Sequence, residues 1–553
     1  MAVPAQSPVL ILGAGINGAA IARELTLNGV SVVVVDPQDI ASGATAYSSR
    51  LAHGGLRYLE YGEFELVRES LEERNRWLRL APHLTRPMRF VIPVASRFGG
   101  LWQAGTRFFG LPGWMRSKKP RPRGLWTVRL GLWFYDRFVG ESTVPSRTLG
   151  EADRLPITPQ YGRKQCEYGN AQLLYPERMT VSLFADAQRA AGETQAKFSL
   201  FTYHRAKLNG DAIEITEIAL NEIVKSFRPS AIIDAAGSWV DEALKQLPVS
   251  DERRMAGTKG SHAITSHTGL RAAIGDRAVY AEAQDGRPIF IIPFRTRVLI
   301  GTTDLPFKGD PSTAVADEFE LTYLTQIVQD LFPQLGFKRE DIEQHYSGVR
   351  PLPYVGPATP AAVTRKHWHV EIPGVSVPCY AVIGGKLTTC RSLAEETVAT
   401  ILKRLGLPVR GSSRDRSLQG EFISPSGASI RIPNDLKSIR LDADVLDELE
   451  RFYGNAVGEF LQKSHRENDE QIDGTRWPCS IVRWMIAHEW VERLEDLVER
   501  RMMLVFEPRL KRSTIAHLAS ILGKEKGWND DAIDAATRSS VETLRRRYGK
   551  LVE

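Results

Sequence analysis

The chain has 553 residues, of which 42% are hydrophobic and 25% are charged, as in ordinary soluble globular proteins and unlike disordered ones. Its net charge of +6 is small for this length, so a general affinity for nucleic acid is not expected. A chain of this size exceeds what one hydrophobic core supports, which predicts two or three domains.

Four cysteines are too few for a disulfide framework, and none has the spacing of a metal ligand, so no metal site is predicted. No stretch reaches the roughly 18 consecutive apolar residues of a transmembrane helix. No basic segment of the kind that opens a signal peptide precedes the apolar Val9–Leu12. We therefore expect a cytoplasmic protein, or at most one that lies on the inner face of the cytoplasmic membrane.

The first structural signal is a βαβ unit at the N-terminus. The runs 9–12 and 32–35 are typical of buried parallel strands, and 17–28 fits a helix between them. The turn that joins the first strand to the helix has the spacing Gly-x-Gly-x-x-Gly, which allows a tight turn, close approach to a pyrophosphate and close packing. An acid ends the second strand, where it can accept the ribose hydroxyls. A dinucleotide is therefore expected to bind at Gly13, Gly15, Asn17, Gly18 and Asp36.

The segment 48–58 places a histidine, two glycines and an arginine–tyrosine pair directly after this unit. Glycines beside a histidine suit the close approach of backbone to a flat ring. His53 has a pKa suited to accepting a hydroxyl proton near neutral pH. Arg57 and Tyr58 are donors for a phosphate or a carboxylate.

The segment 63–80 has the apolar spacing of a long amphipathic helix. The segment 96–140 differs, because tryptophans and phenylalanines alternate there with arginines and lysines. One interpretation is a peripheral element that presses aromatic side chains into a membrane interface and basic groups onto anionic lipid. The other is a loop whose aromatic side chains pack on the body of the protein while its charges are solvated.

Further along the chain, 231–235 is predicted as a buried strand ending near Gly237, and 289–294 with 298–303 as a β-hairpin. His262 is a second candidate base. Arg350, in a proline-stiffened stretch, and Arg365 would bind a doubly charged phosphate if they converge with Arg57. Any one of these arginines by itself is more often a solvated surface residue.

The segment 382–389 again reads as a strand, a glycine pair and the start of a helix. A second helix N-terminus favours FAD over a nicotinamide cofactor, because reduced flavin carries negative charge that the helix dipole stabilises. Lys386 follows the glycine pair directly. Residues 408–433 are predicted to be a linker.

Beyond the linker the pattern is helical. Val445, Leu449, Phe452 and Phe460 fit one helix, and Trp484, Val491, Leu494 and Val498 a second. Ile515, Leu518 and Leu522 fit a third that stops at Gly523. The predicted fold class is α/β: a Rossmann-like dinucleotide-binding domain with an interleaved antiparallel-sheet substrate domain (α+β), followed by a C-terminal all-α domain.

The chain resembles the FAD-dependent glycerol-3-phosphate dehydrogenases and oxidases from Gly13 into its C-terminal helices. The resemblance is carried by the stretches GAGINGAAIA, SSRLAHGGLRYLEYGEFELVRESLEER, APHLTRPMRFVIPV, KGSHAI, IGTTDLPFKGDP, SGVRPL, IGGKLTTCRSLAE and AHEWVERLEDLVERRMML. It places the FAD-binding domain at 1–95, 155–250 and 345–407, the substrate domain at 96–154 and 251–344, and the helical domain at 434–553.

The resemblance implies oxidation of sn-glycerol 3-phosphate to dihydroxyacetone phosphate. The hydride would pass from C2 to flavin N5, His53 would take the hydroxyl proton, and electrons would pass to a quinone or to oxygen. FAD would also contact Ser48, Ser49, His53, Gly237, Gly385, Lys386, Leu387 and Thr388. The phosphate would be held by Arg57, Tyr58, Arg350 and Arg365, with Arg350 and His262 as further catalytic candidates. The C-terminal helices would form a cap or a dimer contact.

Two alternatives remain open at this point: an oxidase of a hydroxy acid or amino acid that uses Arg350 alone, and a catalytically silent flavoprotein. The chain also departs from the usual family pattern at 175–179, at 236–239 and at 353–355. The first departure lies near the substrate side in relatives, so the identity of the substrate is less secure than the reaction class.

Overall fold

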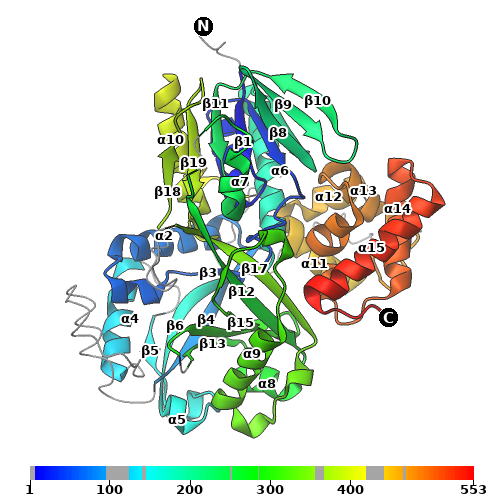
Figure 1. Ribbon diagram of the computed structural model, residues 1–553. Coiled ribbons are helices and arrows are strands. Elements are labelled where there is room, and N and C mark those ends of the chain that lie inside the picture. The colour runs from blue at the N-terminus through cyan, green and yellow to red at the C-terminus, as the bar shows by residue number, and fades with distance from the viewer. Residues whose placement is uncertain are drawn as a thin grey trace.

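The computed structural model describes residues 7–94, 124–139, 145–249, 252–283, 285–354, 366–418, 441–464 and 469–553. Two large sheets lie one above the other, and a bundle of C-terminal helices packs beside them (Figure 1).

The upper sheet has six strands, all parallel to their neighbours except for one antiparallel strand at its edge. Its order is β18 (Trp368–Glu371), β19 (Cys379–Ile383), β11 (Ala231–Asp234), β1 (Val9–Leu12), β2 (Val32–Asp36) and β7 (Phe198–Thr202). The strands predicted at 9–12, 32–35 and 231–235 are confirmed within one residue. Helix α1 (Ile16–Leu27) joins β1 to β2 as the sequence indicated.

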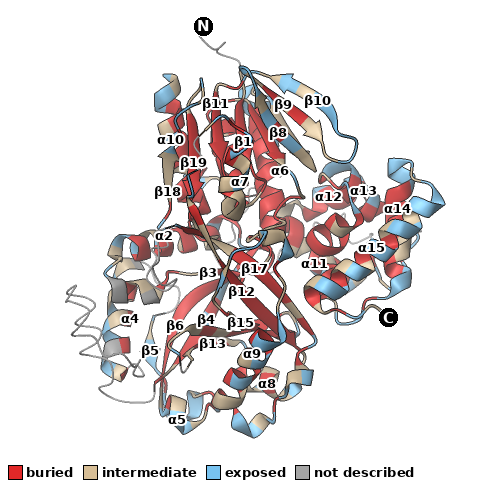
Figure 2. Ribbon diagram, in the orientation of Figure 1, coloured by how far each residue is buried: buried red, intermediate tan, exposed pale blue. Residues whose placement is uncertain are grey.

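Both faces of the upper sheet are covered, which is why β1 is apolar at every position (Figure 2). Val9 and Ile11 pack on the side of α1, α6 (Pro176–Thr194) and α10 (Cys390–Leu405). Leu10 and Leu12 pack on the side of α7 (Val240–Leu244) and a small sheet. That small sheet consists of β8 (His204–Asn209), β9 (Ala212–Glu217) and β10 (Glu222–Phe227).

The lower sheet is antiparallel apart from the pairing of β4 with β13. Its order is β16 (Leu305–Phe307), β12 (Met255–Thr265), β15 (Arg297–Gly301), β14 (Pro288–Phe294), β13 (Arg277–Glu282), β4 (Thr85–Val94), β6 (Lys164–Leu173) and β3 (Leu51–Ala52), with β17 (Gln344–Pro353) on β12 and β5 (Arg147–Thr148) on β6. The predicted hairpin is β14 with β15. Helices α8 (Thr268–Ile274) and α9 (Glu318–Leu331) pack on one face, and α5 (Pro159–Gly162) is a single short turn near β4.

The domain boundaries expected from the sequence differ from this arrangement. They place 85–94, 164–173 and 345–353 in the FAD-binding domain, whereas β4, β6 and β17 are hydrogen-bonded into the lower sheet. Apolar alternation identifies a strand but does not specify which sheet it joins, since that depends on long-range pairing. The described part of the expected linker, 408–418, packs on the upper domain, where Arg416 binds the buried carboxylate of Asp186.

The C-terminal helices begin and end differently from the prediction. The first predicted helix is two, α11 (Ala443–Tyr453) and α12 (Val457–Ser464), because Gly454 turns the chain at φ +53°. The second, α13 (Cys479–His488), ends before Val491, and a π-helical turn at 496–501 contains Val498.

The third predicted helix, α14 (Arg512–Lys526), continues through Gly523 and is capped by Gly527, which has φ +70°. A side chain at Gly523 would lie 2.6 Å from Ile533, so this glycine allows the last helix, α15 (Asp530–Tyr548), to pack closely. The bundle shares a hydrophobic core with the lower sheet.

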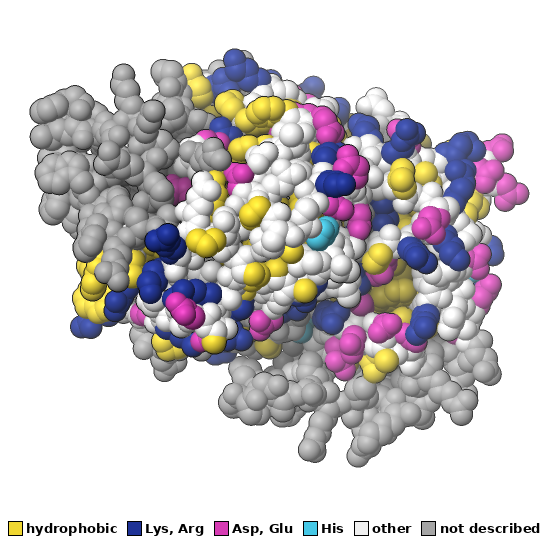
Figure 3. Space-filling view, turned by 90° about the horizontal axis from the view of Figure 1, so that it is seen from below, with side chains coloured by type: hydrophobic (Ala, Val, Ile, Leu, Met, Phe, Trp, Pro, Cys, Tyr) yellow, Lys and Arg dark blue, Asp and Glu magenta, His cyan; other side chains and the backbone are white. Residues whose placement is uncertain are grey.

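Helix α2 (Phe64–Leu80) confirms the predicted amphipathic helix, and α4 (Leu125–Val139) packs against it. Three large side chains of α4 are about half exposed: Trp126 at 49%, Leu130 at 55% and Trp133 at 50%. Hydrophobic side chains gather at the left edge of Figure 3, the side on which Figure 1 places α4. The rest of the aromatic and basic segment, 96–123 and residue 140, lies outside the described residues.

Candidate active site

A cavity of about 990 Å³ lies between the two sheets. The chain segments that follow β1, β2, β11 and β19 line it, together with residues of β12 and β17. In an open parallel sheet, ligands bind outside the carboxyl ends of the strands, and this cavity is in that position. Its volume is at the upper end of the range for ligand sites.

The first glycine turn is shaped by contacts that exclude side chains. A Cβ at Gly13, which has φ +106°, would lie 2.7 Å from the carbonyl oxygen of Ala235. A Cβ at Gly18 would lie 2.0 Å from the carbonyl oxygen of Gly13. Gly15 lines the cavity and has only Thr45 Oγ1 nearby, at 3.5 Å. The three roles predicted for a dinucleotide turn therefore fit these three positions.

Asp36 ends β2 and lines the cavity at the same edge. Its Oδ2 accepts the N–H of Ala14 at 2.7 Å, and its Oδ1 accepts the N–H of Gln38 at 2.8 Å. Burial raises the pKa of Asp36 to about 6 despite these two bonds. The carboxylate is therefore fixed in orientation, and hydroxyl groups that donated to it would favour its charged form.

A second glycine turn, at 384–385, meets the first one. Both glycines have positive φ, and a Cβ at Gly385 would lie 2.9 Å from Nδ2 of Asn17. The Oδ1 of Asn17 is buried and has no protein partner among the described residues. Asn17, Gly385, Lys386, Leu387 and Thr388 all line the cavity. The sequence placed these two turns 370 residues apart, and the fold brings them into contact.

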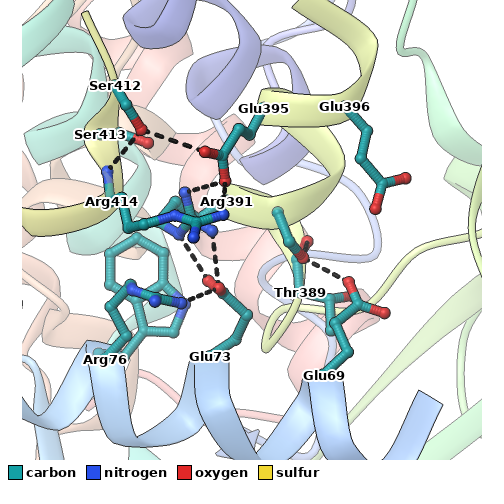
Figure 4. Close-up of polar contacts among 12 residues, drawn as sticks. Glu69, Glu73, Arg76, Thr389, Arg391, Glu395, Glu396, Ser412, Ser413 and Arg414 are labelled. Atoms are coloured by element: carbon teal, nitrogen blue, oxygen red, sulfur yellow. Dashed lines mark hydrogen bonds and ion pairs between the residues drawn. The ribbon is translucent and has the colours of Figure 1, made fainter. Parts of the chain in front are cut away.

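The second turn is tied firmly to helix α2. Trp77 Nε1 donates to the carbonyl of Thr388 at 3.0 Å, and the hydroxyl of Thr388 accepts the N–H of His53 at 3.0 Å. Behind the turn, Glu73 of α2 accepts two bonds from the buried guanidinium of Arg391, each 2.7 Å long, and Glu395 adds a third (Figure 4). These bonds fix α2, α10 and the turn between them as one unit.

Three imidazoles line the cavity, those of His53, His204 and His262, and the two predicted as site residues, His53 and His262, differ in environment. The Nδ1 of His53 accepts the N–H of Gly55 at 3.1 Å, which places the proton of the neutral ring on Nε2. The Nε2 of His262 lies 2.9 Å from Ser49 Oγ, and its ring stacks on that of Tyr346. Burial, helped by the charges of Arg350 and Arg50, holds the pKa of His262 well below its ordinary value. His262 is therefore neutral.

Lys386 and Arg350 are among the cationic residues that line the cavity. The Nζ of Lys386 lies 4.0 Å from the centre of the Tyr58 ring and 3.3 Å from Ser70 Oγ. Arg350 donates to Asp304 Oδ1 at 2.8 Å and to Thr302 Oγ1 at 2.8 Å. The Asp304 carboxylate offsets the charge of Arg350, so an anion that binds Arg350 must compete with it.

The structure places most of the predicted site residues on one cavity. Ser48, Ser49 and Gly237 also line it. Arg365 lies outside the described residues, and so does the side chain of Arg57, whose backbone is in the short 3-10 helix Leu56–Tyr61. Whether these two arginines join Arg350 therefore stays a prediction.

Sequence reasoning missed residues whose role depends on tertiary contacts. Thr45 Oγ1 accepts the N–H of Ile16 at the start of α1, at 3.2 Å. Thr302 and Asp304 orient Arg350 from another strand connection. Only the repeated threonines of the stretch IGTTDLPFKGDP could have pointed to such a role.

The departure from the family pattern at 175–179 does not line the cavity. Glu177 instead binds the guanidinium of Arg50 through bonds of 2.6 and 2.9 Å, and both side chains are buried. Arg178 binds Glu489 of the helical domain in the same bidentate manner. The segment connects domains, so its departure bears on packing more directly than on the substrate.

Two family patterns match the chain. The one described as "FAD dependent oxidoreductase" covers residues 8–389, and the one described as "C-terminal domain of alpha-glycerophosphate oxidase" covers 395–533. The chain belongs to the FAD-dependent oxidoreductases. FAD is therefore its cofactor, and the resemblance to glycerol-3-phosphate dehydrogenases is confirmed over most of the chain.

Among its relatives is D-erythritol 1-phosphate dehydrogenase of Brucella abortus (strain 2308), 32% identical over 91% of this chain and 95% of that protein. The aerobic glycerol-3-phosphate dehydrogenase of Escherichia coli (strain K12) is 30% identical over 89% of this chain and 93% of that protein. The structure of a glycerol-3-phosphate dehydrogenase from Bacillus halodurans complexed with FAD has the same fold, with a TM-score of 0.71 at 20% identity over 98% of this chain and 95% of that one.

The residues present fit FAD. A side chain at Gly13 or Gly18 would collide with backbone, and the absence of one at Gly15 leaves the cavity open to a pyrophosphate. The unpartnered Oδ1 of Asn17 lies where the two turns meet. Asp36 would bind the adenosine ribose, and the N-terminal part of α10 with Lys386 would face the flavin ring.

We predict that FAD binding weakens at acidic pH. Because Asp36 has a pKa near 6 in the ligand-free protein, lowering the pH below 6 protonates it and removes an acceptor for the ribose hydroxyls. The dissociation constant of FAD should rise by up to about tenfold per pH unit below 6 and stay flat above it. Fluorescence of FAD released on dilution of the holoenzyme measures this constant. In Asp36→Asn, binding should be weaker at pH 8 and much less dependent on pH; an identical profile in both proteins would contradict the assignment.

Proposed function

We propose that this protein oxidises sn-glycerol 3-phosphate at C2 to dihydroxyacetone phosphate and passes the electrons to a quinone. The proposal rests on one observation above all: Lys386, Tyr58, Arg350 and His53 all line the cavity that the FAD family motifs line. Bound FAD supplies the two-electron acceptor. The cationic groups favour a phosphate, while the histidine provides for the proton that leaves the hydroxyl.

His53 is the better proton acceptor of the two imidazoles. A proton on His262 would create a charge in a ring that is 2% exposed and lies near two guanidinium groups. His53 is less buried and lies beside the second glycine turn through its bond to Thr388. To accept a proton at Nε2, His53 must adopt the tautomer with hydrogen on Nδ1 and give up the bond from Gly55. His262 would then orient Ser49 without changing its charge.

A second candidate substrate is a longer polyol phosphate. The relative from Brucella abortus carries the name of a D-erythritol 1-phosphate dehydrogenase and matches this chain over nearly its full length. Both substrates present a secondary alcohol next to a phosphate-bearing end, so the same cationic groups and the same histidine would serve either. What distinguishes them is the space beyond the reacting carbon.

Anaerobic reduction of the bound flavin tests the substrate. We expect sn-glycerol 3-phosphate to bleach the visible flavin absorbance within seconds. D-erythritol 1-phosphate is tested separately at the same concentration, and the two rates are compared. Faster bleaching by the four-carbon substrate would move the assignment to that substrate. Bleaching by lactate or an amino acid, with neither polyol phosphate active, would refute a phosphate substrate.

Substitution of the two histidines tests the proton acceptor. His53→Gln should lower the rate of flavin reduction by about 10²- to 10⁴-fold, the usual contribution of general-base catalysis. His262→Gln should have a smaller effect, because its role is to orient Ser49. The holoenzyme spectrum verifies that FAD is retained in both variants. A larger loss in His262→Gln than in His53→Gln would reverse the two roles.

We also propose that α4 contacts the membrane from which a quinone would be reached. Trp126, Leu130 and Trp133 recur at helical spacing and are half exposed, and Arg129 and Arg137 stack on the two tryptophans. Aromatic rings with basic groups beside them are typical of an element that lies at an anionic interface. Among the described residues, no helix has both the length and the apolar character needed to cross a bilayer.

Vesicle co-sedimentation tests this contact. The protein should sediment with vesicles that contain anionic lipid, and Trp126→Ser combined with Trp133→Ser should reduce the bound fraction several-fold. Phe319→Ser is the matched control, because Phe319 is 72% exposed on a different helix, α9. Binding that is unaffected by the tryptophan substitutions would place the contact elsewhere, and failure to sediment at any salt concentration would exclude it.

A further inference from the structure

The C-terminal helical bundle contacts the loop along which FAD binds. This loop, residues 37–49, connects Asp36 with the segment before His53 and is called here the cofactor loop. Ser42, Thr45, Tyr47 and Ser49 of the loop line the cavity. The loop consists of turns and bends with no strand pairing, so it is held by a few backbone hydrogen bonds and by side-chain contacts with neighbouring elements.

One end of the cofactor loop is held by two arginines of the bundle. Asp39 is fully buried, and its Oδ2 accepts Arg500 Nε at 2.6 Å and Arg501 Nη1 at 2.9 Å. Its Oδ1 accepts Arg501 Nη2 at 2.8 Å. Both arginines lie in the π-helical turn 496–501, and neither lines the cavity. Burial alone would raise the pKa of Asp39, but Arg501 and Arg500 lower it, so the carboxylate is charged.

The other end is held by the last turn of α15. Arg547 Nη1 donates to the hydroxyl of Tyr47 at 2.8 Å, and the rings of Tyr47 and Tyr548 lie 6.1 Å apart. The hydroxyl of Tyr548 donates to Glu499 at 2.9 Å, and Arg500 donates to the same carboxylate oxygen at 3.0 Å. The contacts at the two ends of the loop are therefore joined through Glu499.

We propose that the C-terminal bundle sets the affinity of the protein for FAD by clamping the cofactor loop at Asp39 and at Tyr47. Arg500, Arg501 and Arg547 are positioning residues, since they act on FAD only through the loop. A loop that is already ordered binds its ligand without a further loss of conformational entropy. If the clamp is released, the loop must be ordered by FAD itself, and affinity falls. The proposal concerns FAD and does not depend on which polyol phosphate is oxidised.

The dissociation constant of FAD tests the clamp. It is measured from the fluorescence of FAD released on dilution of the purified holoenzyme, in parallel with the thermal unfolding midpoint. We expect Arg501→Met and Arg547→Met each to weaken FAD binding at least tenfold. Arg547→Lys should recover most of the affinity, because an ammonium group can still donate to Tyr47. The visible circular dichroism of the flavin should change in the two methionine variants, since the loop contacts its binding site.

Arg297→Met is the matched control. Arg297 is as buried as Arg501 and donates to the carbonyl of Phe506 in the same C-terminal domain, but it touches neither the cofactor loop nor the cavity. It should lower the unfolding midpoint while FAD binding stays within twofold of the original protein. If Arg501→Met fails to fold, Arg547→Met and Arg547→Lys test the same clamp at its Tyr47 end. The proposal is overturned if the Arg547→Met variant binds FAD with the original affinity. It is also overturned if Arg297→Met weakens FAD binding as much as the clamp variants do.

Discussion

The close approach of two backbone segments at the carboxyl ends of β1 and β11 controls the geometry of the whole cavity. Gly13 lies so near Ala235 that a Cβ would come within 2.7 Å of its carbonyl oxygen. The same turn brings Gly18 against the carbonyl of Gly13 and so fixes the angle at which α1 leaves the sheet. Because α1 starts at this point, its N-terminus faces the cavity where a pyrophosphate binds.

The second glycine turn depends on the first for its position. Gly385 packs against Asn17, so the start of α1 and the approach to α10 form one side of the cavity. Glu73 and Arg391 hold α10 to α2, and α2 continues the segment that carries His53 and Tyr58. Buried ion pairs of this kind contribute little net stability but are strongly destabilising when broken. Their effect here is to fix, relative to each other, elements that carry candidate site residues.

Charge compensation distinguishes the two ends of the cavity. Asp36, at the end where we expect the adenosine, is a partly buried carboxylate that accepts two backbone N–H groups, and its pKa is raised to about 6. Arg350, at the other end, is already paired with Asp304. An anionic substrate there would need a further cation, and Lys386 is among the other cationic residues that line the cavity. This division would suit the proposed function, in which one end of the cavity binds FAD and the other binds a phosphorylated substrate.

The sequence by itself determined the local features: the strand–turn–helix at 9–28, the acid after β2, the second turn at 384–385 and the amphipathic helix α2. Each follows from spacing within a few residues, which local sterics and periodicity dictate. Only the tertiary structure decided that β4, β6 and β17 join the lower sheet, that helices in the C-terminal bundle end at Tyr453 and Lys526, and that Glu177 binds Arg50. It also decided that Asp304 accompanies Arg350 and that the bundle holds the cofactor loop. These features depend on contacts between residues far apart in the chain, and a single sequence contains no local signal for such contacts.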